Sequence, residues 1–507
     1  MKGLENIYRR FLSILGAGVL TMVVAFIATP IIVRLLGPGG YGDYAVVLSI
    51  FSLYMIPVSS GITLGVQKFV SEDRDDPYWQ EHVIRFYTLL AFGTVFVGVV
   101  VMVGFTALGG AAYFFSEEFT LYLYLLGGLI LVAQFRGLCD RILLGMSLEL
   151  LSGPLSVILK FLTVSVGILF ILSGLHVEGM IAGHIIAHLW VVLLATYWIV
   201  RRVSLKALFE TIPDSFPYRT ILSFNGFNIA LVILVSTLYH VDIIMLRILS
   251  DSETTGFYKA ALGLAEYLWI APIALKTVLL HSSSTLWSND RFDTITRVSA
   301  RVTRYTILLT VLMGIGLAVL STRFVPLYYG EAFSVAVTPL LLLLPGVIGF
   351  AGARPLKSIS QGSGKMRVLI AVTTVAAVMN LLLNAALIPI FGMNGAAVAT
   401  SISYGSMFFL FVWAAWKIGY DPLDDFRASR IVGTAILAAP VIWLTNHLLT
   451  HDIVALVVVP VVGGVVFGIA ALAVGAIDRT DLLPVLERLP DPIRDVFDPV
   501  VSWIDEL

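Results

Sequence analysis

Charged residues are scarce in this chain of 507 residues: Asp, Glu, Lys and Arg together make up 13% of it, whereas 58% is hydrophobic. About a quarter of the residues in a soluble globular protein are charged. So few charged residues could not cover the surface of a water-soluble protein of this size. The mean hydropathy of +0.95 also indicates a strongly apolar chain. The low charge therefore excludes a soluble globular protein and favours a chain that lies mostly within a membrane.

Cysteine and net charge are also nearly absent. The one cysteine, Cys139, excludes an intrachain disulfide, and the apolar run around it predicts a small buried core residue. The formal net charge of -1 argues against a nucleic-acid partner. The acidic run at 73–76 superficially resembles a metal-binding pattern, but it lies in a predicted cytoplasmic loop with no companion site, so we expect a solvated charge run. The sequence therefore predicts no metal site and no cofactor.

Long apolar segments are what the chain has in abundance. Segments such as 89–108 and 454–477 match the roughly 20 residues that cross a hydrocarbon core. We predict an all-α polytopic membrane protein with about fourteen transmembrane helices, at residues 11–36, 42–66, 84–109, 119–144, 150–173, 179–200, 220–248, 256–282, 304–327, 333–356, 367–390, 395–416, 430–449 and 453–476.

The distribution of Lys and Arg orients these helices. The connections predicted on one side, such as 37–41, 174–178 and 391–394, contain no Lys or Arg, whereas those on the other side carry many, among them Arg9, Arg74 and Arg201. Basic residues gather in cytoplasmic loops. We therefore expect a multi-pass protein of the cell membrane with both termini in the cytoplasm. The outer loops are too short to hold a folded domain.

An internal repeat divides the chain. Gly42 and Gly256 stand 214 positions apart, as do Tyr44 and Tyr258, and further glycines and prolines keep nearly the same offset. The offset spans an even number of helices, so both halves share one orientation, as in transporters that work by alternating access. We predict two pseudo-symmetric six-helix lobes at 1–205 and 206–420, two extra transmembrane helices at 421–477, and an acidic cytoplasmic tail at 478–507.

Two prolines extend the repeat. Pro57 and Pro272 lie inside corresponding predicted helices, 215 positions apart. Because an interior proline kinks a helix, they are hinge candidates. The alternative is that proline is simply common in membrane helices. In the last predicted helix, Gly464 and Gly468 form a small-xxx-small pattern that predicts a packing face.

Five short segments carry a family resemblance. They are 35–38, 41–45, 256–260, 361–365 and 388–397, with the sequences LLGP, YGDYA, GFYKA, QGSGK and IPIFGMNGAA. Over roughly residues 5–476 the chain resembles polysaccharide-export flippases of the O-antigen type, in the multidrug/oligosaccharidyl-lipid/polysaccharide exporter superfamily. The resemblance implies a fourteen-helix transporter, not an enzyme, that moves a polyprenyl-phosphate- or diphosphate-linked oligosaccharide to the outer leaflet. Its implied partners are that lipid, membrane lipid, and glycosyltransferases or a polymerase of the same pathway.

Ionisable residues inside the predicted helices are the candidate site residues, because such groups are costly in hydrocarbon. Cations can neutralise phosphate, and carboxylates can carry a coupling proton or sodium ion. The candidates for the substrate head group are Arg34, Arg136, Lys160, Lys259 and Lys276, and those for coupling to H⁺ or Na⁺ are Asp140, Asp242 and Glu266.

Each candidate has a structural alternative. Arg34 could extend to the membrane interface. Arg136 and Asp140 share one helix face at i and i+4 and could form a structural ion pair. Asp242 and Glu266 could pair internally with Arg247 or Lys259. Three histidines could relay protons or could simply be satisfied by packing partners: His184, His188 and His240.

Two other functions compete with the flippase. A cation-coupled multidrug exporter of the same superfamily would favour a cavity dominated by carboxylates and about twelve helices. In this chain basic residues outnumber acids at membrane depth, and two extra helices are predicted. A membrane-embedded glycosyltransferase or ligase would need a sizeable outer loop or domain, and the predicted outer loops are short.

Overall fold

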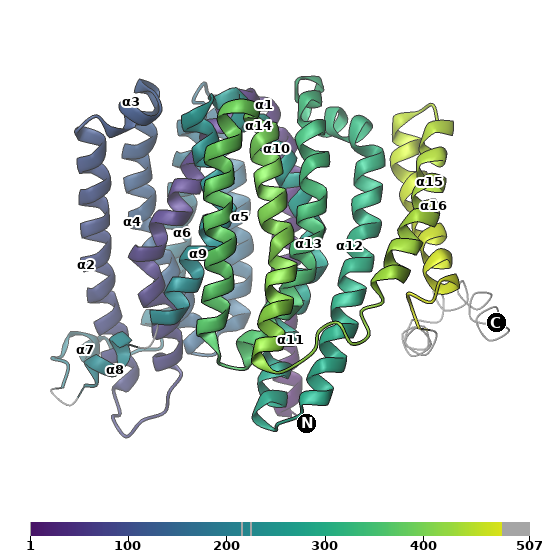
Figure 1. Cartoon of the computed structure of the whole chain (residues 1–507). Coiled ribbons are helices and arrows are strands. Elements are labelled where there is room, and N and C mark those ends of the chain that lie inside the picture. The colour runs from purple at the N-terminus through teal and green to yellow at the C-terminus, as the bar shows by residue number, and fades with distance from the viewer. Residues whose placement is uncertain (1, 214–215, 224–225, 479–507) are drawn as a thin grey trace. The chain divides into compact units, whose positions relative to one another are not determined.

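The computed structural model describes residues 2–213, 216–223 and 226–478, and every regular element in this part of the chain is a helix (Figure 1). The α-helices are α1 (Lys2–Val70), α2 (Trp79–Ala107), α3 (Gly110–Phe114), α4 (Glu117–Gly145), α5 (Glu149–Leu172), α6 (Val177–Val200), α7 (Leu205–Phe209), α8 (Tyr218–Ser223), α9 (Gly226–Leu249), α10 (Ser252–Glu266), α11 (Ile270–Ser288), α12 (Phe292–Tyr329), α13 (Val337–Gly362), α14 (Met366–Ile418), α15 (Ala428–Leu448) and α16 (Asp452–Ala473). Two 3₁₀ helices are η1 (Tyr267–Trp269) and η2 (Glu331–Ala336).

Eleven helices within the described residues are long and apolar enough to cross a membrane. The prediction of an all-α polytopic membrane protein is therefore confirmed. Two of the eleven, α1 and α14, each consist of two helices joined at one non-helical residue. The predicted helix at 256–282 corresponds to α10, η1 and α11, which are not among the eleven. The number fourteen stays a prediction.

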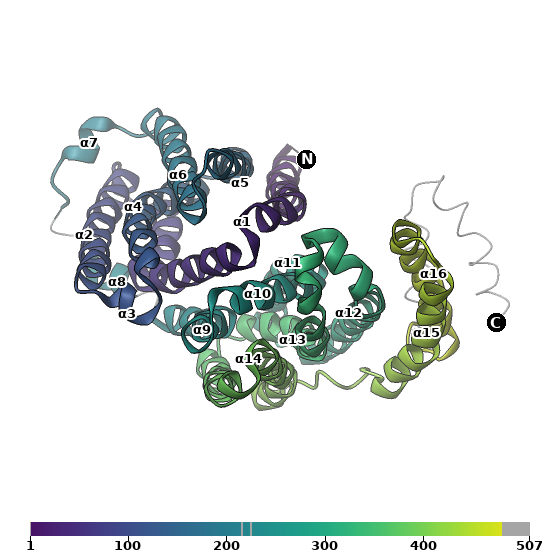
Figure 2. The same cartoon turned by 90° about the horizontal axis from the view of Figure 1, so that it is seen from above.

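A single glycine makes each of these two joints. Gly37 in α1 has φ 68° and ψ 176°, and Gly392 in α14 has φ 56° and ψ -132°. Residues with a side chain are strained in these regions of backbone space, whereas glycine is not. The predicted outer loops at 37–41 and 391–394 are thus reduced to one-residue reversals between helices. The change of direction in α1 is visible in Figure 2.

The chain forms two compact units. The first contains residues up to 260 together with 328–333 and 377–399, and the second contains 261–327, 334–376 and the residues from 400 onward. Within the first unit α5 packs on α6, α4 packs on α6, and α1 packs on both α4 and α5. The predicted lobes, extra helices and tail stay a prediction, and most of the tail, 479–507, lies outside the described residues.

Two glycines related by the internal repeat contact each other in the first unit. A Cβ atom at Gly42 of α1 would collide with the carbonyl oxygen of Ser252, and one at Gly256 of α10 would collide with that of Pro38. Pro38 and Ser252 are themselves 214 positions apart, so the contact is reciprocal. The backbones of α1 and α10 can approach this closely only because both residues lack a side chain.

The prediction of a packing face at Gly464 and Gly468 is wrong. A Cβ atom at either position would meet nothing within 4 Å. The neighbouring Gly463 is the one that packs, since a Cβ there would lie 3.3 Å from Cδ1 of Ile442 in α15. A pattern of small residues gives the spacing of a helix face but not the rotation of the helix.

The two hinge candidates lie in different local settings. Pro57 is exposed inside the unbroken second half of α1. Pro272 is buried in the first turn of α11, directly after the 3₁₀ turn η1. A proline there lacks the N–H that would continue the α-helical ladder, which agrees with the break at η1. Their role as hinges stays a prediction.

Candidate functional site

Four helices of the first unit bring polar side chains together within predicted membrane spans. Near one another on these helices lie Tyr44 of α1, Arg136 and Asp140 of α4, Lys160 of α5, and His184 and His188 of α6. We refer to these six residues as the basic cluster. Three of them, Arg136, Asp140 and Lys160, were predicted as site residues from sequence. The two histidines were considered as proton relays or as residues satisfied by packing partners.

The close approach of α5 and α6 explains how two members of the cluster meet. A Cβ atom at Gly183 would lie 2.7 Å from the backbone nitrogen of Gly167, so the helices cross almost backbone to backbone. His184 follows Gly183 directly, and Lys160 lies two turns before Gly167 on α5. Lys160 is consequently near enough to His184 to interact with it electrostatically.

Hydrogen bonds hold the two histidines. His184 Nε2 lies 2.8 Å from the Tyr44 hydroxyl oxygen, which joins α6 to α1. His188 Nδ1 lies 2.8 Å from the backbone carbonyl oxygen of His184. A carbonyl oxygen only accepts, so Nδ1 of His188 carries the hydrogen and its Nε2 is the acceptor in the neutral ring. The i, i+4 spacing of these two histidines on an apolar helix is a sequence signal that could have placed them on one helix face.

Arg136 and Asp140 share one face of α4, as their spacing predicts. Both line a small hollow of about 10 Å³, together with Ser156 of α5 and Val191 of α6. Asp140 accepts a hydrogen bond of 2.5 Å from the Ser152 hydroxyl rather than pairing with Arg136. Asp140 therefore does not form the intrahelical ion pair with Arg136 that was the structural alternative.

The two cations of the basic cluster have no protein counter-ion in the described part of the chain. Neither Arg136 nor Lys160 makes a hydrogen bond or an ion pair with any residue among 2–213, 216–223 and 226–478, and both are half-buried. A buried cation without a counter-ion is costly in a membrane protein and is kept where it binds something. This arrangement suits an anionic ligand.

The other predicted cations lie in other surroundings. Arg34 is exposed near the end of the first half of α1, where its side chain lies beside Gly330. Arg34 and Lys259 each interact with other residues. Lys276 lies in α11, but its side chain is outside the described part of the structure. The structure therefore brings Arg136 and Lys160 to one cluster and leaves the others elsewhere.

Asp242, a coupling candidate, is fully buried in α9. It accepts a hydrogen bond of 2.5 Å from the hydroxyl of Tyr258 in α10 and one of 2.8 Å from the backbone N–H of Ile243. Pairing of Asp242 with Arg247 is wrong, because Arg247 Nε donates to Asp43 at 2.7 Å. Glu266, the other coupling candidate, is half-buried at the end of α10 and also interacts with other residues.

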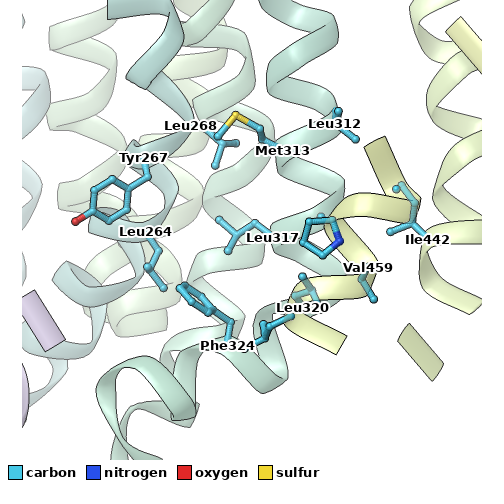
Figure 3. A pocket seen from close by; sticks show the side chains of 14 residues that line it. Leu264, Tyr267, Leu268, Leu312, Met313, Leu317, Leu320, Phe324, Ile442 and Val459 are labelled. Atoms are coloured by element: carbon cyan, nitrogen blue, oxygen red, sulfur yellow. The ribbon is translucent and has the colours of Figure 1, made fainter. Parts of the chain in front are cut away.

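The second unit contains an apolar cavity of about 400 Å³ (Figure 3). Its lining consists of aliphatic and aromatic residues, proline and glycine, from α10, η1, α12, α15 and α16. Leu317 and Phe324 of α12 line it, as do Ile442 of α15 and Val459 of α16. A cavity with this largely apolar lining accepts hydrocarbon, and no charged residue lines it.

Replacing Tyr44 by phenylalanine is expected to lower the free energy of unfolding by about 1–3 kcal/mol, because His184 Nε2 then loses its partner in a buried position. The measurement is thermal unfolding of the purified protein in detergent. The control is Tyr124→Phe, an exposed tyrosine on α4. Equal melting temperatures for the two variants would mean that the hydrogen bond contributes nothing to stability.

Two family models match the chain. The model described as polysaccharide biosynthesis protein matches residues 7–275, and the model described as lipid II flippase MurJ matches residues 259–463. Between them they match residues 7–463, which include most of both compact units. The first match alone takes in the whole basic cluster, from Tyr44 to His188.

Two curated proteins of Haloferax volcanii are similar to the chain. It is 23% identical to the probable low-salt glycan biosynthesis flippase Agl15, over 84% of this chain and 87% of that protein. It is 22% identical to the probable flippase AglR, over 91% of this chain and 94% of that protein. Both alignments span most of the length of the relative, 87% of Agl15 and 94% of AglR.

Solved structures with the same fold include two transporters. The lipid II flippase MurJ in an inward closed conformation superposes with a TM-score of 0.72 at 16% identity, over 90% of this chain and 98% of that one. An inward-facing multidrug resistance transporter of the MATE family superposes with a TM-score of 0.68 at 14% identity, over 78% of this chain and 94% of that one. At these identities the likeness establishes the fold.

Proposed function

This chain belongs to the polysaccharide biosynthesis protein family, and from that premise we propose that it is a flippase. Its cargo is a polyprenyl-phosphate- or diphosphate-linked oligosaccharide, which it moves from the cytoplasmic to the outer leaflet for the assembly of surface polysaccharide or glycoprotein glycans. The observation that carries the proposal is the pair of half-buried cations Arg136 and Lys160, which have no counter-ion among the described residues. The names of the two Haloferax volcanii relatives support it.

The basic cluster binds the phosphate of the cargo in this proposal. Arg136 presents a planar fork that matches phosphate oxygens, and Lys160 adds a point charge from the next helix. His188 lies near Arg136 and offers Nε2 as a further polar contact. The phosphate thus supplies an ion-pairing partner, which Arg136 and Lys160 lack among the described residues.

The apolar cavity of the second unit takes part of the polyprenyl tail. A volume of about 400 Å³ holds several isoprene units, and its lining has no charged residue. Each buried methylene contributes about 0.8 kcal/mol, so even a few units in the cavity give useful affinity. The tail therefore adds affinity without a specific polar contact.

The remaining parts of the proposal concern the transport cycle. Alternating exposure of the site to the two sides of the cell membrane uses the lobes at 1–205 and 206–420, with bending at Pro57 and Pro272. Asp140, Asp242 and Glu266 are the groups proposed to bind a coupling H⁺ or Na⁺. Both termini are cytoplasmic, which rests on the distribution of Lys and Arg. Glycosyltransferases or a polymerase of the same pathway supply or consume the cargo.

Two alternatives are disfavoured by chemistry. Multidrug transporters share the fold, but cations without counter-ions attract anions and repel cationic drugs. A membrane glycosyltransferase or ligase would use carboxylates to activate an acceptor, whereas Asp140 is held by Ser152 and Asp242 by Tyr258. We therefore propose a transporter without covalent chemistry.

A reconstitution experiment tests the proposal. Purified protein is placed in vesicles that contain a fluorescent polyprenyl-phosphate-linked sugar, and the fraction of label that becomes accessible to an impermeant quencher is followed with time. We expect transport of this lipid and no uptake of cationic dyes. Dye uptake without movement of the lipid-linked sugar would support the drug exporter, and release of free carrier phosphate would support the enzyme.

A substitution that fills the cavity tests the tail site. Gly316 of α12 lines the cavity, and a Cβ atom there would meet nothing within 4 Å, so Gly316→Leu adds a side chain without a backbone collision. We expect transport to fall about tenfold, which is the loss of roughly two methylene contacts with the tail. The control is Gly464→Leu on α16, equally uncrowded but outside the cavity. Equal transport by both variants would exclude the cavity as the tail site.

A further inference from the structure

One arginine of α12 binds the open end of the α15–α16 hairpin, where α15 begins and α16 ends. Arg304 is fully buried; its Nη1 donates to Oδ2 of Asp425 at 2.6 Å, and its Nη2 donates to Oδ2 of Asp478 at 3.2 Å. Asp425 lies just before α15, and Asp478 follows α16. A single guanidinium group therefore ties the beginning and the end of the hairpin to the same point of α12.

A second arginine strengthens this attachment. Arg427 donates from Nε to Oδ1 of Asp425 and from Nη1 to Oδ1 of Asp478, each at 2.6 Å. Its hydrogen bond lowers the pKa of the Asp478 carboxyl below the ordinary value. A carboxyl with a lowered pKa contributes stability above its ordinary pKa and loses it only as the pH falls through the lowered value. The attachment therefore stays charged and intact at neutral pH.

The turn of the hairpin is attached as well. Arg323, further along α12, donates from Nη2 to the carbonyl oxygens of Leu449 at 2.7 Å and Asn446 at 3.0 Å. Its Nη1 donates to Oδ1 of Asp452, the first residue of α16, at 3.1 Å. The last carbonyls of a helix lack partners within the helix and attract cations. Arg323 therefore binds the place where α15 ends and α16 begins.

The apolar cavity lies along α12 between these two attachments. Arg304 and Arg323 are 19 residues apart, which corresponds to about 28 Å of helix. Most of the α12 residues that line the cavity, from Leu312 to Leu320, lie between the two arginines, and Phe324 directly follows Arg323. Ile442 and Val459 of the hairpin line it as well. The middle of the hairpin thus lines part of the cavity and packs beside it on apolar residues of α12 such as Leu320. Its turn and its open end are bound to α12 by charged and polar contacts.

Polar contacts at the turn and at the open end of the hairpin matter because apolar contacts between helices are weak in a bilayer. Lipid tails are as apolar as leucine, so apolar helix faces gain little by associating in a bilayer. A hairpin next to an unfilled cavity has fewer packing contacts still. Contacts through arginine at the two ends hold the hairpin in place whether the cavity is filled or empty. A tail can then enter and leave while the position of the hairpin stays the same.

We propose that Arg304 and Arg323 are positioning residues for the lipid tail: by clamping both ends of the α15–α16 hairpin on α12, they hold open the cavity that receives the polyprenyl chain. The inference rests on the proposed function. It assigns a task to these two arginines that is distinct from binding the head group. It also predicts that the clamps affect long-tailed cargo and leave short-tailed cargo unaffected.

The test compares two probes in vesicles, a sugar linked to dolichyl phosphate and the same sugar linked to citronellyl phosphate. The wild type is expected to move the long-tailed probe faster. Arg304→Gln and Arg323→Gln are each expected to reduce the ratio of long-tail to short-tail rates about tenfold, with the short-tail rate nearly unchanged. Arg304→Lys, which keeps the charge but replaces the planar fork of donors with a single ammonium group, should give an intermediate ratio.

A control variant and a second clamp variant distinguish loss of the clamp from a general loss of folding or charge. Arg297→Gln changes an exposed arginine of α12 whose side chain bonds only to its own helix, at the carbonyl of Asp293, and it should leave the ratio as in the wild type. Arg304→Gln would leave Asp425 and Asp478 without this partner and could fail to fold. Arg323→Gln is expected to fold, because the carboxylate partner of Arg323, Asp452, is 60% exposed, and its ratio of long-tail to short-tail rates then tests the inference. A parallel fall of both rates in the clamp variants would overturn the inference alone. A wild type that moves neither probe would instead overturn the proposed function.

Discussion

Replacing Arg136 and Lys160 together by alanine is expected to lower transport of a lipid-linked sugar phosphate about a hundredfold or more, with normal amounts of folded protein in the membrane. Each cation contributes one or more charge-assisted hydrogen bonds to phosphate, worth about 1.5–3 kcal/mol apiece, and tenfold in rate or affinity corresponds to about 1.4 kcal/mol. The fold should survive, because neither side chain has a hydrogen bond or ion pair to lose among the described residues. Adding Lys276→Ala tests the third predicted cation.

The matched control for this variant is Arg141→Ala. Arg141 lies on the same helix as Arg136, but its Nη1 donates to Oε1 of Gln67 at 3.0 Å. Its removal takes away the same charge from α4 without touching the basic cluster, so transport should stay within a few-fold of the wild type. The measurement is the initial rate in vesicles, normalised to the protein inserted. Unchanged transport by the double variant would remove Arg136 and Lys160 from the site.

Gly42→Ala and Gly256→Ala are each expected to lower the free energy of unfolding by about 1–3 kcal/mol, the usual range for overpacking. The new methyl group would collide with a backbone carbonyl oxygen, of Ser252 or Pro38, which cannot rotate away as a flexible side chain could. The helices α1 and α10 must then move apart. The measurement is thermal unfolding together with the amount of folded protein recovered from the membrane.

The control for the glycine pair is three residues away. A Cβ atom at Gly39 would lie 3.5 Å from Oγ of Ser252, an ordinary contact, so Gly39→Ala should unfold like the wild type. The double variant of Gly42 and Gly256 should be less destabilised than the sum of the single variants, because one separation of the helices relieves both collisions. A Gly42→Ala protein as stable as Gly39→Ala would contradict the backbone contact.

Local patterns of the chain account for the parts of the fold that were predicted. Apolar runs of membrane length predicted the helices, since burying a backbone in lipid requires its hydrogen bonds to be made within the segment. At 37–41 and 391–394 the sequence predicted outer loops, and the structure has reversals of one residue there, at Gly37 and Gly392, whose backbone angles glycine tolerates. The shared face of Arg136 and Asp140 follows from the helical period alone.

The sequence patterns did not predict which residue each side chain pairs or packs with. Arg247 pairs with Asp43 rather than with Asp242, which lies on its own helix. Asp140 pairs with a serine of the next helix rather than with the arginine one turn away. Gly463 packs where Gly464 was predicted to. In each case the outcome depends on how neighbouring helices are rotated and how closely they approach, and these quantities leave no trace in residue spacing.

By itself, the order of residues determined that the chain is a helical membrane protein with an internal repeat and with basic residues at membrane depth, because hydropathy, helical period and glycine conformation are properties of short segments. Only the tertiary structure decided which of those basic residues lack a counter-ion, where the apolar cavity lies, and how Arg304 and Arg323 hold its wall. The physical reason is that charge compensation and empty space are properties of several packed helices at once, and no single helix contains them.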